Sequence, residues 1–275
     1  MTVGVGSAGV PEEVRQAALF PVLDLPDPPV GHPLELARRD GYSLFSFAGL
    51  TFGSASVYRV SFERLNDVLA DARTFMRERG KKHLHWLVPE EAEPSGLADA
   101  LGALGMPPSE EPPGEPRVAA MAMVAPPAPG PAQIEARPAR TFEEFHAATH
   151  LSDEAFDLSE ADRVASLNAA EAMRELLCSE HPSVRTFVAL VDGEIGGQAA
   201  VIFGTHAGFL VGGSTRSEMR GRGVYRALVR ARWDAAVERG TPALTVKAGR
   251  MSHPILERLD FQVIGWEDSL LDRLD

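Results

Sequence analysis

The 275-residue sequence contains a single cysteine, Cys178, so no disulfide can form within the chain. Disulfides persist in oxidising compartments, and one lone thiol is typical of a reducing one. No apolar run approaches the length that a membrane-spanning helix requires. The opening residues, MTVGVGSAGVPEEVRQ, lack the basic and apolar parts of a signal peptide. We therefore expect a cytoplasmic protein with no membrane partner.

Basic charge is also scarce, because 27 lysines and arginines face 39 aspartates and glutamates, for a net charge of -12. Nucleic acids and anionic membranes bind to basic faces, so neither is expected as a partner. An acidic surface suits cationic ligands, amines among them. Hydrophobic residues make up 44% of the chain and charged residues 24%, which is ordinary for a globular protein. The length allows two domains, each large enough to close a core.

Strands and helices alternate along the sequence, which predicts a mixed α/β protein. Asp192-Gly193 predicts a hairpin turn between two strands, and Ser61 is expected to cap the strongest helix. Strands are predicted over 42–60, 82–89, 117–125, 134–139, 184–204, 206–216, 243–249 and 261–274. Helices are predicted over 10–20, 61–80, 95–106, 141–149, 159–178, 224–240 and 252–259.

The run PPAPGPAQ, residues 126–133, is the clearest break in the chain. Its proline, glycine and alanine content is that of a semi-rigid linker, so we place domains at 1–125 and 134–275. The two parts echo each other. Each has a helix that ends in Arg-Gly, at Gly80 and at Gly240, followed by a strand and a short helix. This order predicts a structural repeat.

Two arginines and two glycines, Arg220-Gly221-Arg222-Gly223, directly precede a predicted helix. The first amides of a helix have no internal partner and lie at the positive end of its dipole, so they bind phosphate. A tight turn with a solvated arginine face is the structural alternative. A dinucleotide fingerprint needs a third glycine where Arg226 stands, and a nucleotide-binding P-loop needs a following lysine with serine or threonine, which is missing.

The segment resembles the pyrophosphate loop of the GCN5-related N-acetyltransferase (GNAT) family, Arg/Gln-x-x-Gly-x-Gly/Ala after the fourth strand. Arg220, Gly223 and Tyr225 occupy its specified positions, with tyrosine in place of glycine or alanine. The resemblance extends over 134–275 in the order of elements, and MSHPILERLDF is similar to the family's fourth helix. The first part is similar to a GNAT half without the glycine-rich loop.

The resemblance implies tandem GNAT-like domains, an α/β fold with a mixed sheet, in which the C-terminal domain is complete and the N-terminal one degenerate. It implies acetyl-CoA as co-substrate, held between splayed fourth and fifth strands, with Gly212-Gly213 suited to the bulge that splays them. No metal is implied, and His83 and His85 lack a third ligand nearby. The implied cofactor-binding residues are Gly213, Ser214, Thr215, Arg220, Gly221, Arg222, Gly223, Val224, Tyr225 and Arg226.

The family's catalytic groups are largely replaced in this sequence. Leu256 matches the position of the usual tyrosine acid, and Gly249 that of a nearby asparagine. Ser252 is the substitute acid we favour, with a helix N-cap as its structural alternative and His253 as a second choice. No glutamate occurs in the fourth strand, although the segment 152–162 carries carboxylates, whose alternative role is to favour helix starts.

Two functions follow from these residues. The first is an N-acetyltransferase that moves acetyl from acetyl-CoA to a primary amine of a small molecule or peptide. The second is a non-catalytic acyl-CoA-binding regulatory module, which the missing tyrosine and glutamate favour. The acceptor and the oligomeric state are not specified by the sequence.

Overall fold

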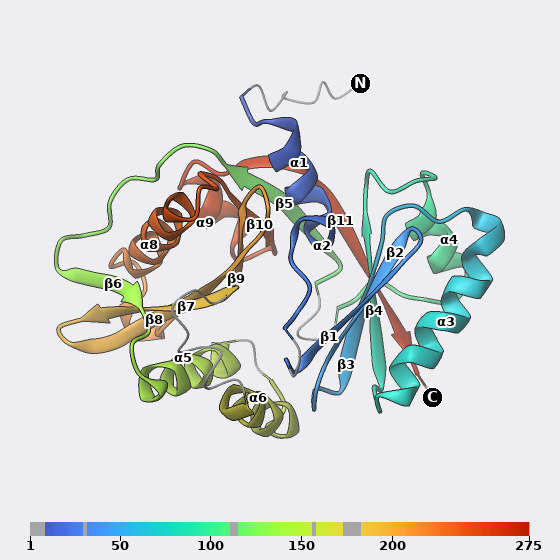
Figure 1. Ribbon diagram of the computed structural model, residues 1–275, viewed down its shortest axis with the longest axis horizontal. Coiled ribbons are helices and arrows are strands. Elements are labelled where there is room, and N and C mark those ends of the chain that lie inside the picture. Colours follow the sequence, from blue (N-terminus) through green and yellow to red (C-terminus); the bar gives the residue numbers. More distant parts are fainter. Residues whose placement is uncertain (1–8, 30–31, 111–114, 156–157, 173–182, 275) are drawn as a thin grey trace.

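A computed structural model describes residues 9–29, 32–110, 115–155, 158–172 and 183–274. Cys178 and the end of the helix predicted over 159–178 lie outside this part. The chain forms one mixed sheet with helices packed on it (Figure 1). The strands are β1 (Leu34–Arg39), β2 (Tyr42–Phe47), β3 (Phe52–Val57), β4 (His83–Pro89), β5 (Arg117–Met123), β6 (Ile134–Pro138), β7 (Val184–Val191), β8 (Glu194–Phe203), β9 (Gly208–Thr215), β10 (Leu244–Ala248) and β11 (Gln262–Arg273).

Apart from α2, which was not predicted, the helices follow the predicted positions. They are α1 (Glu12–Leu19), α2 (Pro21–Asp24), α3 (Leu65–Glu78), α4 (Leu97–Ala103), α5 (Phe142–Ala155), α6 (Glu160–Ala172), α8 (Val224–Glu238) and α9 (His253–Glu257), with short 3-10 turns η1 (Phe62–Arg64) and η2 (Ser217–Met219). None of the helices in the described part of the chain has the length and apolar character needed to cross a membrane.

The predicted repeat is confirmed. In each half an antiparallel three-stranded meander leads to a helix, and the helix to a strand parallel to the last one: β1 to β3 with α3 and β4, then β7 to β9 with α8 and β10. A short helix follows each time, α4 and α9. The α3 helix packs on the sheet because Leu65, Val68, Leu69, Ala72 and Met76 form a buried stripe at helical spacing.

The final strand of each half lies in the sheet beside strands of the other half. The sheet order β1-β2-β3-β4-β11-β5-β10-β9-β8-β7-β6 places β11 between β4 and β5, and β5 between β11 and β10. Asp272 of β11 is buried and accepts hydrogen bonds from Arg73 of α3 and from the indole N–H of Trp86 in β4. The two halves therefore share one sheet, which the rainbow colours of Figure 1 show at its centre.

The faces of the sheet differ in their cover. Ala119, Met121 and Met123 of β5 join the core beneath α8, whereas Ala120 and Ala122 join the core beneath α1. In β8 the residues Ala199, Val201 and Phe203 also face α8, and α5 contacts β7, β8 and β9 from the other side. Helices α1 and α5 thus lie on one face of the sheet and α8 on the opposite face.

The structure corrects and extends several local predictions. Ser61 makes no side-chain capping bond, because a 3-10 turn precedes α3 and places the hydroxyl outside capping geometry. Strand β1 was not expected from its polar sequence LELARR. The hairpin at Asp192-Gly193 is confirmed, with φ of 54° and 86°. The predicted linker packs along α8, where Arg230 donates to the carbonyl of Pro127 at 3.1 Å.

Candidate functional site

Strands β9 and β10 separate partway along their length. Only Gly208–Leu210 pairs with Leu244–Val246, so the remainder of β9 has no strand on that edge. The separation begins where β9 bulges: Gln198 pairs with Ser214 but Ala200 pairs with Val211, which leaves two residues of β9 opposite one of β8. The bulge expected at Gly212-Gly213 is confirmed. Beyond it, backbone groups on the free edge of β9 can bind a ligand in an extended conformation.

The bulge needs both of its glycines. Gly212 has a φ of 61°, which side chains rarely adopt, and a Cβ on Gly213 would lie 2.7 Å from Cε2 of Tyr225. Buried Gln198 of β8 holds the bulge by donating to the carbonyl of Gly212 and to Oγ of Ser214. Gln198 was not predicted as a site residue, although a glutamine within the apolar strand EIGGQAAVIF is a recognisable signal.

Arg232 lies beneath the bulge and is entirely buried. It donates to the carbonyl of Ala200 at 3.2 Å and to that of Leu228 at 3.1 Å, and its guanidinium carbon is 5.8 Å from the ring centre of Tyr225. Burial lowers the pKa of this guanidinium. A buried cation without a carboxylate partner in the described structure is costly, and the bond to Ala200 joins α8 to β8 beside the bulge.

Helix α8 begins directly after the bulge and its loop, with Gly223 at the N-cap. Its first amides have no intrahelical acceptor. Arg220, Arg222 and Arg226 are exposed around this end of the helix. Arg222 makes only a 3.5 Å contact with exposed Asp192, and within the described residues Arg220 and Arg226 pair with no carboxylate. The resulting surface has unpaired positive charge in an otherwise acidic protein.

Gly223 has a structural reason of its own for being glycine. Its φ is 87°, and a Cβ would lie 2.6 Å from Cγ of Pro131 in the linker. Gly221 also has a positive φ, of 76°, but no atom lies within 4 Å of its Cβ position. A substitution of Gly223 therefore disturbs the contact with the linker as well as any ligand, and the exposed arginines are the better residues for testing anion binding.

Solved structures share this architecture. A GCN5-related N-acetyltransferase from Kribbella flavida is 18% identical, with a TM-score of 0.66 over 94% of this chain and 95% of the other. A tandem GNAT protein from the clavulanic acid biosynthesis pathway is 16% identical, with a TM-score of 0.59 over 96% and 89%. A GCN5-related N-acetyltransferase from Sphaerobacter thermophilus is 17% identical, with a TM-score of 0.58 over 85% and 77%. The chain has the tandem GNAT fold.

No protein-family model and no curated protein matches the sequence. The likeness to GNAT proteins is therefore one of fold, and the family resemblance deduced from the sequence is confirmed at that level.

The position of the usual GNAT tyrosine is closed. Leu256 is fully buried in the core beneath α8 and α9. Ser252, the predicted acid, stands at the N-cap of α9 but makes no capping bond, and its hydroxyl instead donates to the carbonyl of Gly249 at 3.3 Å. His253 packs edge-on against Trp266, with ring centres 5.4 Å apart. Ser252 is therefore the residue of these three that offers a hydroxyl hydrogen-bond donor at the end of β10, next to the separation from β9.

Within segment 152–162, Asp157 lies outside the described residues, while Asp153 and Asp162 make contacts that hold the helices. Asp153 is buried and accepts from Ser166 at 3.1 Å, and its burial raises the pKa of its carboxyl group. Asp162 accepts from the amide of Thr51 at 2.9 Å and so joins α6 to the first half. His85 likewise contacts Ser109, at 2.8 Å, and within the described residues no three metal-ligating side chains gather.

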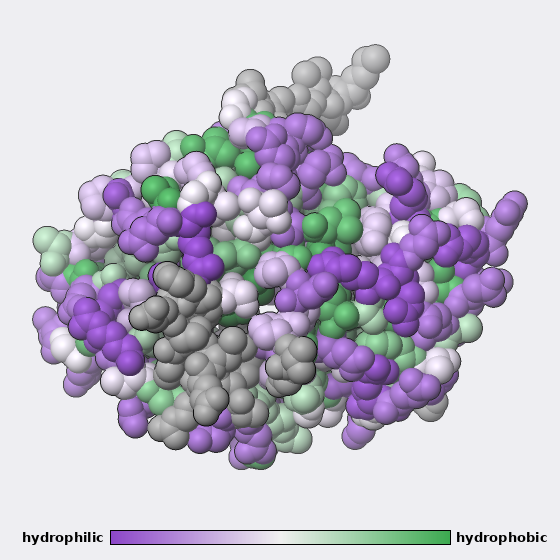
Figure 2. Space-filling view, viewed as in Figure 1, coloured by the Kyte–Doolittle hydropathy of each residue, from purple (hydrophilic) through white to green (hydrophobic). Residues whose placement is uncertain are grey.

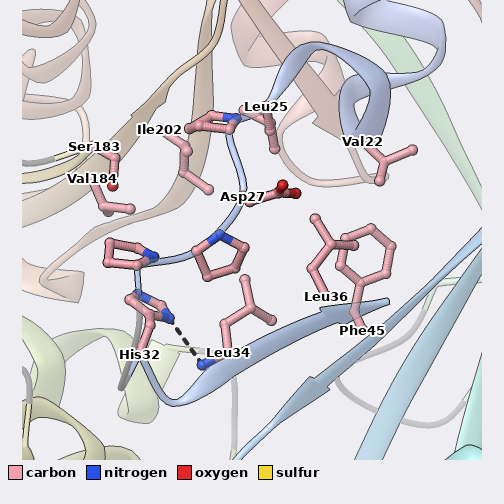
Figure 3. A pocket seen from close by; sticks show the side chains of 13 residues that line it. Val22, Leu25, Asp27, His32, Leu34, Leu36, Phe45, Ser183, Val184 and Ile202 are labelled. Carbon is pink, nitrogen blue, oxygen red and sulfur yellow. Dashed lines mark hydrogen bonds between the residues drawn. The ribbon is translucent and has the colours of Figure 1, made fainter. Parts of the chain in front are cut away.

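A small apolar pocket lies between the two halves (Figure 3). Its walls are Leu34, Leu36 and Phe45 of β1 and β2, and Val184 and Ile202 of β7 and β8. Its volume of about 50 Å³ is too small for a coenzyme A ester. The molecular surface in Figure 2 has hydrophobic residues near the middle of the face and hydrophilic ones around its right-hand rim. The apolar pocket of Figure 3 is lined by no residue of β9, so it is separate from the free edge of that strand.

Proposed function

We propose that the protein binds acyl-CoA at the second half of its sheet. The observation that carries the proposal is the combination, in one place, of a bulged strand with a free edge and a helix N-terminus with three exposed arginines, of which only Arg222 contacts a carboxylate in the described structure. Backbone groups of Gly213, Ser214 and Thr215 would hold the pantetheine arm. The amides and side chains from Arg220 to Arg226 would hold the pyrophosphate, because helix N-termini favour anions.

We further propose that the protein is an N-acetyltransferase, which moves acetyl from acetyl-CoA to a primary amine of a small molecule or peptide. A thioester held on the free edge of β9 has a backbone amide within reach of its carbonyl, and an N–H there stabilises the oxyanion that forms on attack. The net charge of -12 favours cationic acceptors. The experiment is to measure free thiol release from acetyl-CoA with amines, amino acids, polyamines and aminoglycosides.

The buried Leu256 at the tyrosine position favours a second candidate, an acyl-CoA-binding module without turnover. The same experiment separates the two. Thiol release that requires an amine supports the transferase. A rise in melting temperature with acetyl-CoA, together with no thiol release on any amine, supports the binding module.

The first half is expected to bind no CoA. Strands β3 and β4 pair without a break from Phe52–Ser56 to His83–Leu87, so they have no free edge. The first turns of η1 and α3 carry Glu63 and Asp67, which repel phosphate. Calorimetric titration with acetyl-CoA should therefore give one equivalent per chain, and two equivalents would contradict this prediction.

Replacing Ser252 with alanine tests its role as the acid that protonates the CoA thiolate. A positioned acid contributes roughly 10²–10⁴-fold, but serine is a weak acid, so we expect kcat to fall about 10-fold to 100-fold. Acetyl-CoA binding should not change. Because the hydroxyl makes no capping bond, the melting temperature should fall little. A normal kcat in Ser252→Ala would show that the hydroxyl has only its local contact with Gly249.

A further inference from the structure

The carboxylate of Glu115 lies against Gly249 at the end of β10. Its Oε2 accepts a hydrogen bond from the amide of Arg250 at 2.6 Å, and both oxygens occupy the space that a side chain on Gly249 would fill. Glu115 lies two residues before the start of β5, which runs antiparallel to β10 and pairs Ala119 with Ala248. A carboxylate from the first half of the chain therefore fills the space beside Gly249 that a side chain at this position would occupy.

The alternation of β10 identifies the face on which this carboxylate lies. Ala248 points into the core beneath α8, whereas Lys247 points the other way and donates to the carbonyl of Leu19 in α1. Gly249 follows Lys247 by two residues and shares its face. Glu115 is thus on the face opposite α8, next to the part of β10 that has separated from β9.

Helix α1 covers this face of β10 at Lys247, and the Glu115 carboxylate lies past the end of the strand, at Gly249. Helix α5 flanks the other side of the separation, where Oγ of Ser152 lies 3.8 Å from the Cβ position of Gly212. A thioester whose phosphates lie at the N-terminus of α8 presents its carbonyl between β9 and β10. An amine that arrives from the opposite face then meets the thioester carbonyl with Glu115 beside it, and Glu115 is partly exposed there.

Other carboxylates on this face are engaged or distant. Glu267 is buried in an ion pair with Lys247 at 2.8 Å. Asp153 is bonded to Ser166. Glu91 lies over Gly265 of β11, which is two strands from β10 and so about 10 Å farther from the separation. Oε1 of Glu115 accepts no hydrogen bond that the described structure contains.

We propose that Glu115 is the general base of acyl transfer. This proposal rests on the proposed transferase function. The amine nitrogen attacks the thioester carbonyl carbon and forms the C–N bond. Oε1 of Glu115 takes the proton that the nitrogen loses. The tetrahedral intermediate collapses, the C–S bond breaks with its electron pair going to sulfur, and the CoA thiolate receives a proton from water or from Ser252, whose hydroxyl solvent then reprotonates. Glu115 then returns its proton to solvent.

Glu115→Gln is the decisive variant, because the glutamine carbonyl can still accept from the amide of Arg250. We expect kcat with the best amine of the panel to fall at least 100-fold, within the range for a positioned base, while the Kd for acetyl-CoA stays unchanged. Added acetate should restore part of the activity of Glu115→Ala, which leaves space for it. A purely structural role would give no such rescue.

Each outcome decides between the proposals. Loss of kcat in Glu115→Gln with normal acetyl-CoA binding supports Glu115 as the base. A wild-type kcat in Glu115→Gln overturns that role and leaves the transferase function intact. If the wild-type protein binds acetyl-CoA normally but releases no thiol with any amine of the panel, both the transferase function and the role of Glu115 are overturned. Melting temperatures of both variants identify any effect that comes from unfolding.

Discussion

Replacing Arg220 and Arg226 together with glutamate is expected to raise the Kd for CoA about 100-fold or more. Both side chains are exposed beside the N-terminus of α8, and neither has a carboxylate partner in the described structure. A hydrogen bond to a charged group is worth about 1.5–3 kcal/mol, and about 1.4 kcal/mol corresponds to a tenfold change in Kd. Charge reversal adds repulsion of the phosphates. The measurement is calorimetric titration with CoA.

A matched variant controls for net charge. Arg77 and Arg258 are also exposed, on α3 and just after α9, and their joint replacement by glutamate changes the net charge equally. This control should bind CoA with nearly the wild-type Kd, since neither arginine lies on α8 or the loop before it and exposed charges are screened in 0.15 M salt. Equal affinity of the two double variants would refute the proposed phosphate site.

Neither half of the chain, 1–125 or 134–275, is expected to fold when expressed alone. The first fragment lacks β11, so β4 loses its neighbour and buried Trp86 loses its partner Asp272. The second lacks β5, so β10 and β11 lose the strand between them. Unpaired backbone groups on central strands are costly, and exposed strand edges aggregate. Neither fragment should show a cooperative thermal transition by circular dichroism.

The two fragments should fold when they are produced together. Cleavage within 126–133 after folding is the control, because it cuts the chain but keeps both central strands. The cut protein should stay associated and keep one acetyl-CoA site. A cooperative transition in either isolated half would mean that each domain closes its own sheet, contrary to the observed strand order.

The sequence predicted the elements better than their arrangement. Periodicity identified α3, and the repeat of Arg-Gly helix ends identified the two halves. The exchange of β5 and β11 could not be predicted, because their apolar alternation fits a place beside either β4 or β10. Strand neighbours are set by long-range packing of a whole sheet, which a local pattern does not contain.

The site divides in the same way. The glycines and arginines of the loop after β9 form a local motif, and the bulge was predicted from the adjacent glycines Gly212-Gly213 within the strand. The Arg232 side chain beneath the bulge and the Glu115 carboxylate on Gly249 were missed. Glu115 lies 135 residues from its partner Arg250 in the sequence. Only the pairing of β5 with β10 brings these two residues together.

The most direct test of the acyl-CoA site is a crystal structure of the protein grown with acetyl-CoA. We expect one molecule per chain, with its pyrophosphate against the amides of 221–226 at the start of α8. The acetyl group should lie between Gly212–Ser214 and the end of β10, with the Glu115 carboxylate on the face of the sheet opposite α8. A pyrophosphate bound elsewhere, or an acetyl group away from the separated strands, would contradict the account.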